Sequence, residues 1–217
     1  MTPEPRHATD RATDRALPLR ERKKLRTRQA LAAAALQMFS ERGLDATTVE
    51  DLVDRAEVSR STFFRVFPAK EAPAIEAEVE LWTAVLAALG ERPLAGPVLD
   101  ALRDVLRETV GALGTEWAHR YVDTRRLVLA EPALLAYMGR YRAEVEQRLA
   151  ERLADRLGLP AEDIRPQVLA ELTTTGWRIA ARSWVHAGGP GGVEVLAERV
   201  GEAFAAVPAS LELTAPR

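Results

Sequence analysis

The chain has 217 residues, of which 47% are hydrophobic and 29% charged, so it is long and apolar enough to fold around one large or two small cores. It contains no cysteine, which excludes disulfides, cysteine-ligated metals and thiol nucleophiles, and its three histidines are too far apart to pair on one helix face. The net charge of −2 combines +5 over residues 1–28 with −7 over the rest, and this asymmetry suggests that the N-terminal end contacts a polyanion.

The sequence also argues against a membrane protein. The longest stretch without a charged residue, 29–40, has 12 residues, whereas a transmembrane helix needs about 20. The N-terminus, MTPEPRHATDR, is charged and lacks the apolar segment of a secretory signal. We therefore expect a cytoplasmic protein with no membrane partner, no metal site and no cofactor.

Residues 1–19 are expected to form a disordered arm, because they hold Pro3, Pro5 and Pro18 and a repeated Ala-Thr-Asp-Arg tetrapeptide. From about Arg20 apolar residues recur at helical spacing, and the pattern ends at Gly43. This predicts a first helix of about 20 residues. Its buried side is formed by Leu31, Ala34, Ala35, Met38 and Phe39.

Two short helices joined by a tight turn are predicted next. Thr47-Thr48-Val49-Glu50 has the pattern of a capping box, in which the Thr47 hydroxyl and the Glu50 carboxylate accept hydrogen bonds from each other's backbone N–H groups. Ser59 can cap a second helix, residues 60–67, which ends before Pro68. With the turn at residues 56–58, this is a helix-turn-helix arrangement.

The segment VSRSTFFRVFPAKE, residues 58–71, resembles the recognition helix and the start of the next helix in TetR/AcrR-type transcriptional regulators. Their usual pattern is Val-Ser-x-x-Thr, two aromatic residues, x-x-Phe-x-x-Lys-Glu, and the resemblance extends upstream in register over about 50 residues. It implies an all-α fold. A three-helix helix-turn-helix DNA-binding domain at 20–70 is then joined by a fourth helix to an all-helical effector-binding and dimerisation domain at 71–217.

The DNA contacts follow from the chemistry of this segment. Hydroxyls at helix N-termini can hold phosphates, and side chains on the exposed side of the second short helix can enter a major groove. Each residue also has a structural alternative, because such hydroxyls cap helices and surface arginines and lysines are usually solvated. The predicted DNA-binding residues are Thr47, Thr48, Ser59, Arg60, Ser61, Thr62, Phe64, Arg65 and Lys70, the last matching the family's phosphate-contacting lysine.

Two positions depart from the family pattern. The turn position usually filled by glycine is Glu57, and a left-handed backbone there would cost about 1 kcal/mol relative to glycine. The position often filled by tyrosine is Phe64, so a hydroxyl-to-phosphate bond cannot form and only apolar contacts with DNA remain.

All later elements are predicted to be helices, at 71–89, 98–113, 116–130, 132–157, 165–187 and 193–206. Pro73 indicates an irregular start to the first of them. The stretch LVLAEPAL, residues 127–134, looks like the mycofactocin-system regulator subgroup. Helix 165–187 is apolar on two faces, and the face with Trp177, Ala181 and Trp184 is predicted to join helix 193–206 in a homodimer interface. Burial of that face within one protomer is the alternative.

An effector pocket is expected among aromatic and polar-tipped residues of this second domain, although such residues also commonly form the core. These candidates contain no basic cluster, which favours a mainly apolar effector. The predicted ligand-binding residues are Trp82, Trp117, Tyr121, Tyr137, Met138, Tyr141 and Trp177.

The sequence thus predicts a ligand-responsive transcriptional regulator, a repressor in its usual form, that binds a pseudo-palindromic double-stranded DNA operator as a homodimer. A small-molecule effector is expected to release it from DNA. The alternatives are a ligand-independent DNA-binding protein and a helical enzyme with an accessory DNA-binding segment. Against the enzyme, the chain has no apparent catalytic grouping of carboxylates or of Ser, His and Asp, and its GGPGG tract lacks the residues of a phosphate-binding loop.

Overall fold

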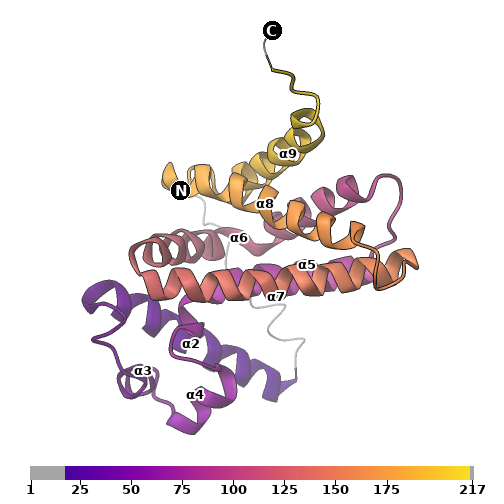
Figure 1. The fold of residues 1–217 in the computed structure, drawn as a ribbon. Helices are drawn as coiled ribbons and strands as arrows, with labels where there is room; N and C mark the ends of the chain where they lie inside the picture. Colours follow the sequence, from indigo (N-terminus) through magenta and orange to yellow (C-terminus); the bar gives the residue numbers. More distant parts are fainter. Residues whose placement is uncertain (1–17, 216–217) are drawn as a thin grey trace, which may run out of the picture. The chain divides into compact units, whose positions relative to one another are not determined.

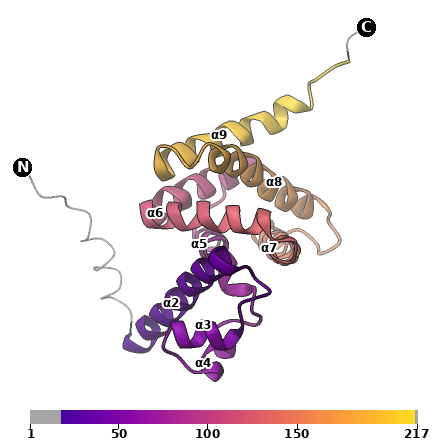
Figure 2. The ribbon, with the colours of Figure 1, turned by 90° about the vertical axis from the view of Figure 1, so that its left-hand side faces the viewer.

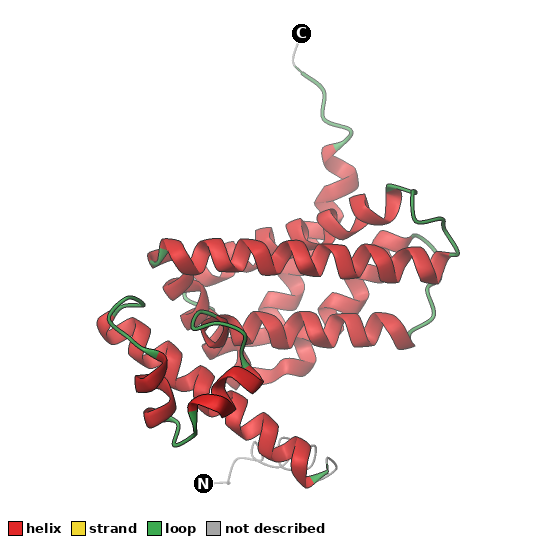
Figure 3. Cartoon of the chain, turned by 60° about the horizontal axis from the view of Figure 1, so that its bottom comes forward, coloured by secondary structure: helices red, strands yellow, loops and turns green. Residues whose placement is uncertain are grey.

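The computed structural model describes residues 18–215, and the chain divides into two compact units between Ala74 and Ile75. Within the described residues there are helices and loops but no strands (Figure 3). The all-α prediction is therefore confirmed. The predicted disordered arm, residues 1–19, lies outside the described residues except for its last two positions.

The described part of the first unit, from residue 18 on, contains the α-helices α2 (Leu19–Arg42), α3 (Val49–Arg55) and α4 (Arg60–Val66) (Figure 1). The end of α2 matches the prediction, because Gly43 has a φ of 84° and its N–H donates to the Phe39 carbonyl over 2.9 Å. The three helices meet around a small apolar core whose members are fully or almost fully buried. These include Leu31, Ala35, Phe39, Leu52, Phe63 and Phe67.

The capping box of α3 lies one residue later than predicted. The Thr48 hydroxyl accepts from the Asp51 N–H, and the Asp51 carboxylate accepts from the Thr48 N–H over 2.8 Å. These hydrogen bonds, the backbone one above all, lower the pKa of Asp51. The predicted Thr47 and Glu50 box is therefore wrong, because Thr47 turns inward and Glu50 forms an ion pair with Arg60.

The turn between α3 and α4 has the strained backbone that the sequence suggested. Glu57 has a φ of 53°, and it is the one non-glycine residue with positive φ in the part of the chain that the structure describes. This left-handed conformation places a side chain where glycine would be relaxed, so the turn keeps its shape at a conformational cost.

A short 3₁₀ helix, η1 (Ala72–Ile75), spans the boundary between the units and leads into α5 (Glu76–Glu91), the first α-helix of the second unit. This is the irregular start that Pro73 predicted. The other helices are α6 (Val98–Ala130), α7 (Pro132–Leu157), α8 (Arg165–His186) and α9 (Gly192–Ser210). Gly114, with φ 76° and ψ 178°, interrupts α6 at the break predicted between helices 98–113 and 116–130.

Packing in the second unit places α6 between α5 and α9, while α8 packs against both α7 and α9 (Figure 2). All four tryptophans have almost no exposed surface and fill the core: Trp82, Trp117, Trp177 and Trp184. Large aromatic side chains thus supply much of the buried apolar area of this unit.

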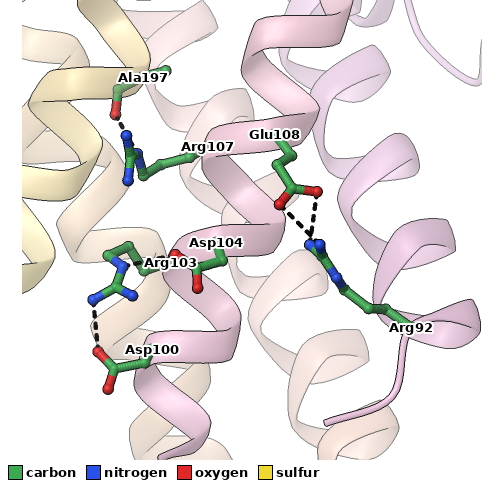
Figure 4. Close-up of polar contacts among 7 residues, drawn as sticks. All are labelled: Arg92, Asp100, Arg103, Asp104, Arg107, Glu108 and Ala197. Carbon is green, nitrogen blue, oxygen red and sulfur yellow. Dashed lines mark hydrogen bonds and ion pairs between the residues drawn. The ribbon is translucent and has the colours of Figure 1, made fainter. Parts of the chain in front are cut away.

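Polar contacts fix α6 to its neighbours (Figure 4). The Arg92 guanidinium, just after α5, donates to Glu108 on α6 over 2.8 Å, and Arg107 on α6 donates to the Ala197 carbonyl on α9 over 3.2 Å. Next to them, Arg103 forms ion pairs with Asp100 and Asp104 of the same helix. These groups are largely exposed, so they orient the helices more than they stabilise the unit.

The face of α8 that was predicted to form a dimer interface is buried within the protomer. Trp177 is 2% exposed, Ala181 1% and Trp184 0%, and the Trp184 indole N–H donates to the Pro190 carbonyl over 3.0 Å. The prediction for this face is therefore wrong, because the facing helices of the same chain already cover it. The exposed apolar residues of α8 lie elsewhere, at Val168 and Ile179.

Candidate DNA-binding and effector sites

Helix α4 has one buried and one exposed side. Phe63 is fully buried in the core of the first unit and Phe67, directly after the helix, is 1% exposed. Their rings lie 5.9 Å apart and hold the helix against the rest of the unit. The opposite side presents Arg60, Ser61, Phe64 and Arg65 to solvent. This is the face that the sequence assigned to the major groove.

Hydroxyl groups gather at the start of α4. The Ser59 hydroxyl accepts from the Thr62 N–H over 3.2 Å and lies 2.9 Å from the hydroxyls of both Ser61 and Thr62. Ser59 is therefore a helix cap, as the structural alternative held. Its cluster is exposed, so these groups remain available to an anion at this helix start.

The two arginines of α4 have different neighbours. Arg60 forms an ion pair with Glu50 of α3, and its guanidinium lies 5.5 Å from the centre of the Phe64 ring. Arg65 donates to the Thr62 hydroxyl over 3.2 Å. Both pairs are exposed, and such contacts exchange readily for contacts to a base edge or a phosphate.

The other predicted DNA-binding residues divide between the surface and the interior. Thr48 is exposed, and the Lys70 ammonium donates to the Leu44 carbonyl over 2.8 Å. Thr47 is fully buried, and its hydroxyl donates to the Gly43 carbonyl over 2.9 Å. Burial removes Thr47 from the surface, so the expected phosphate contact of this residue is wrong.

A basic cleft lies between the beginning of α2 and the turn before α4. Its volume is about 1060 Å³, and Arg20, Lys23, Lys24 and Arg65 are among its lining residues. The charge of residues 1–28 indicated a basic end, but only the folded unit brings that end of α2 beside α4. Positive side chains and a helix start thus share one side of the unit.

The second unit contains a cavity of about 260 Å³ between α5, α6, α7 and α8. Five of the seven predicted ligand-binding residues line it: Trp82, Tyr121, Met138, Tyr141 and Trp177. The other two do not. Trp117 lies in the core, where it stacks on Tyr121 with ring centres 4.9 Å apart and donates to the Ala77 carbonyl, and Tyr137 lies under the Arg140 guanidinium.

Charged residues that the sequence reasoning missed also line this cavity. Glu78 of α5 is 7% exposed, and its Oε1 accepts from the indole N–H groups of Trp82 over 2.9 Å and Trp177 over 3.1 Å. Arg125, Arg142 and Arg178 come from three different helices. The premise that the pocket has no basic cluster is therefore wrong, since residues far apart in the sequence meet only through packing.

The burial of the cavity affects its tyrosines. Burial, followed by the negative charge of Glu78, raises the pKa of Tyr121 well above its usual value, and the same two causes raise the pKa of Tyr141. Both hydroxyls are thus neutral hydrogen-bonding groups at physiological pH.

Comparison with known proteins decides the family. Residues 31–73 match the model of the bacterial regulatory proteins of the tetR family, and residues 96–211 match that of the MftR C-terminal domain. The chain is also 35% identical over 187 residues to the HTH-type transcriptional regulator TcmR of Streptomyces glaucescens, covering 81% of this chain and 82% of TcmR. The chain belongs to the TetR family.

Solved structures of other TetR-family regulators are similar at lower identity. A regulator from Aquifex aeolicus is 16% identical with a TM-score of 0.49, covering 83% of this chain and 99% of that one. GusR of Salmonella enterica is 19% identical with a TM-score of 0.46, covering 84% and 95%. The family assignment rests on the two family models and on TcmR.

TetR-family membership identifies this protein as a transcriptional regulator with a helix-turn-helix DNA-binding domain, and the matched relatives are regulators rather than enzymes. Regulators of this family bind DNA and small-molecule effectors and act as dimers, and most are repressors. The match to the MftR domain confirms the predicted resemblance to the mycofactocin-system subgroup. None of the helices between residues 18 and 215 is long and apolar enough to cross a membrane.

Proposed function

We propose that this TetR-family protein is a cytoplasmic, ligand-responsive repressor that binds a pseudo-palindromic operator as a homodimer. Ligand binding in the cavity of the second unit releases it from DNA. The observation that carries the proposal is the exposed face of α4, where two arginines and a hydroxyl cluster stand on a helix fixed by buried Phe63 and Phe67.

The α4 face supports sequence reading because its arginines are on a rigid element. Arg60 and Arg65 can each pair with the O6 and N7 atoms of guanine, and Phe64, 48% exposed, can contact a thymine methyl group. Thr48, Ser59, Ser61, Thr62 and Lys70 are proposed to contact the DNA backbone. The cleft lysines, Lys23 and Lys24, would neutralise phosphates without reading sequence.

A homodimer through α8 and α9 is supported by apolar side chains on the outer surface of α8. Val168 is 50% exposed and Ile179 51% exposed, whereas the tryptophans of the same helix are buried. A two-fold interface here would cover these side chains and present two α4 helices to two half-sites. We expect Ile179→Glu to weaken the dimer while the protomer keeps its helical content.

The cavity supports effector binding, because it combines aromatic walls with charged groups in a concave site that is open on one side. Few residues separate the cavity residue Glu78 from the DNA-binding unit in the sequence. The boundary between the units lies at Ala74–Ile75, and Glu78 stands in the first turn of α5 directly after it. A ligand on Glu78 would thus act on the helix that leaves the DNA-binding unit, and it would lower DNA affinity by its preference for one of two conformations.

The alternative is a DNA-binding protein that responds to no ligand. The buried Glu78 carboxylate argues against it, because burying a carboxylate costs stability, and an acidic residue kept at such a cost favours a role beyond the fold. The two are separated by whether any small molecule changes DNA affinity.

The test begins with the operator. Full-length protein is used to select binding sites from a pool of random double-stranded DNA, and the enriched sequences are compared. The proposal expects two inverted half-sites separated by about one helical turn or a multiple of it. Enrichment without inverted symmetry, or no enrichment at all, would contradict it. Light scattering on wild type and Ile179→Glu then checks the dimer, and a monomeric wild type at micromolar concentration would overturn that part.

A further inference from the structure

The cavity of the second unit contains a buried acceptor with an unused oxygen. Oε1 of Glu78 accepts both indole N–H groups, but Oε2 is shielded from solvent and has no hydrogen-bond partner among the described residues. A buried acceptor without a donor loses free energy relative to water. Glu78 is one of the residues that line the cavity, so a ligand bound there can supply that donor once the carboxylate turns toward it.

Two of the three arginines at this cavity also lack ion-pair partners among the described residues. Arg125 and Arg178 form neither an ion pair nor a side-chain hydrogen bond within residues 18–215, whereas Arg142 lies 3.6 Å from Glu146. Arg125 and Arg178 also line an adjoining groove of about 630 Å³ that contains Arg126, Arg182 and His186. The side of the cavity with these arginines is therefore strongly basic and open to an anion.

We infer that this cavity binds a small aromatic acid with a hydroxyl group, whose hydroxyl donates to Oε2 of Glu78 and whose acidic group pairs with Arg125 and Arg178. The inference rests on the proposed effector role of the cavity and names the chemical class of the effector. It replaces the mainly apolar effector that the sequence favoured.

Three features select this class over others. The volume of about 260 Å³ is below the range of about 300–1,000 Å³ typical of drug-sized ligands, so one or two rings fit. Trp82, Tyr121, Tyr141 and Trp177 offer ring faces and edges for an aromatic ligand. Three arginines against one carboxylate give the lining a positive balance, which disfavours a cationic ligand and leaves a neutral hydroxyl as the donor to Glu78.

The test uses isothermal titration calorimetry of the full-length protein with 6-hydroxy-2-naphthoate, its 6-methoxy analogue and its methyl ester. The methoxy compound cannot donate to Glu78, so it is expected to bind at least about tenfold more weakly. The ester lacks the acidic charge and is expected to lose a similar factor. Equal affinity of hydroxy and methoxy compounds, binding of 2-naphthylmethylammonium in preference to the acids, or no binding at millimolar concentration would each overturn the inference.

Matched variants test which residues contact the hydroxyl and the acidic group of the ligand. In Glu78→Gln the carboxamide oxygen can keep both indole bonds while its NH₂ group faces the ligand, so the preference for hydroxy over methoxy should fall to within about threefold. Arg178→Gln should weaken the acid but not the ester. Arg140→Gln is the control, because it removes a charge from α7 outside the cavity. Should Glu78→Gln not fold, as judged by circular dichroism, the comparison of ligands on the wild type decides alone.

The calorimetry needs no DNA, so its failure is distinct from failure of the proposed function. Sequence-selective DNA binding without affinity for these acids would remove the ligand class and leave the repressor proposal standing. Tight binding of the hydroxy acid without any effect on bound DNA would leave the ligand class standing and remove the proposed release mechanism.

Discussion

The two units differ in how many polar side chains they bury. In the first unit Thr47 is the one buried polar residue among those described, and the groups proposed to meet DNA lie on the surface. The second unit buries six, including Glu76, Glu78 and Thr124. Reading DNA requires an apolar frame that holds exposed side chains in place, whereas enclosing a ligand requires polar groups inside the core.

This difference also determines how substitutions affect binding and stability in each unit. A substitution on the exposed α4 face should change binding and leave stability unchanged. In the second unit the same side chains fill the core and form the cavity walls, so packing and ligand affinity should change together.

The largest effect is expected at Trp184. Its side chain is fully buried, so Trp184→Ala should destabilise the second unit by about 3–5 kcal/mol. Urea denaturation followed by circular dichroism measures this loss. Leu211→Ala is the control, because this side chain is 84% exposed and its removal should change stability by less than about 0.5 kcal/mol. A stable Trp184→Ala protein that only dissociates would restore the interface role for this face.

Trp184 also shows what periodicity can and cannot predict. The spacing of apolar residues correctly predicted that α8 has two apolar faces. It does not show whether an apolar face packs against a helix of the same chain or against a second protomer. The aromatic cavity residues were found for the same reason, since large apolar side chains must be buried. Glu78 and the three arginines were missed, because they are far apart in the sequence and charged residues are usually solvated.

The first unit was more predictable because its motif fixes a register. The positive φ at Glu57 and the exposed side of α4 follow from that register. The error there was a shift of the predicted capping box by one residue. Thr47 and Thr48 are chemically alike, and either hydroxyl can accept from a helix N–H. Only the fold shows that Thr47 packs inward while Thr48 and Asp51 cap α3.

The next effect concerns DNA binding by the first unit. Arg65→Ala should cost about 1–3 kcal/mol on the selected operator and much less on random DNA, because a bidentate contact to a base is lost. The double change Lys23→Ala and Lys24→Ala should weaken both DNAs alike and flatten the salt dependence. Fluorescence anisotropy across a salt series measures both. Equal losses on the two DNAs for Arg65→Ala would assign this arginine to the backbone.

A backbone effect of similar size is expected in α6. Gly114 has a backbone conformation that is essentially restricted to glycine, so Gly114→Ala should cost about 1–3 kcal/mol although no atom lies near the added methyl group. Gly111→Ala is the matched control. It lies in a helical part of α6 with similar open space, and it should stabilise the unit by up to about 1 kcal/mol. Thermal unfolding of both variants checks the opposite signs, and equal shifts would show that α6 continues through Gly114 without a break.

The smallest effect is expected at Glu57, and it tests whether the helix-turn-helix frame is strained. Its φ of 53° is unfavourable for any residue with a Cβ atom, so Glu57→Gly should stabilise the first unit by about 1 kcal/mol, reduced by the greater freedom of glycine in the unfolded chain. Glu57→Ala separates this from charge, because alanine removes the carboxylate from the basic cleft but keeps the Cβ atom. Both variants should bind DNA more tightly than wild type, since a negative charge leaves the cleft. Only the glycine variant should also unfold at higher urea, and equal midpoints for the two variants would mean that the turn relaxes without strain in solution.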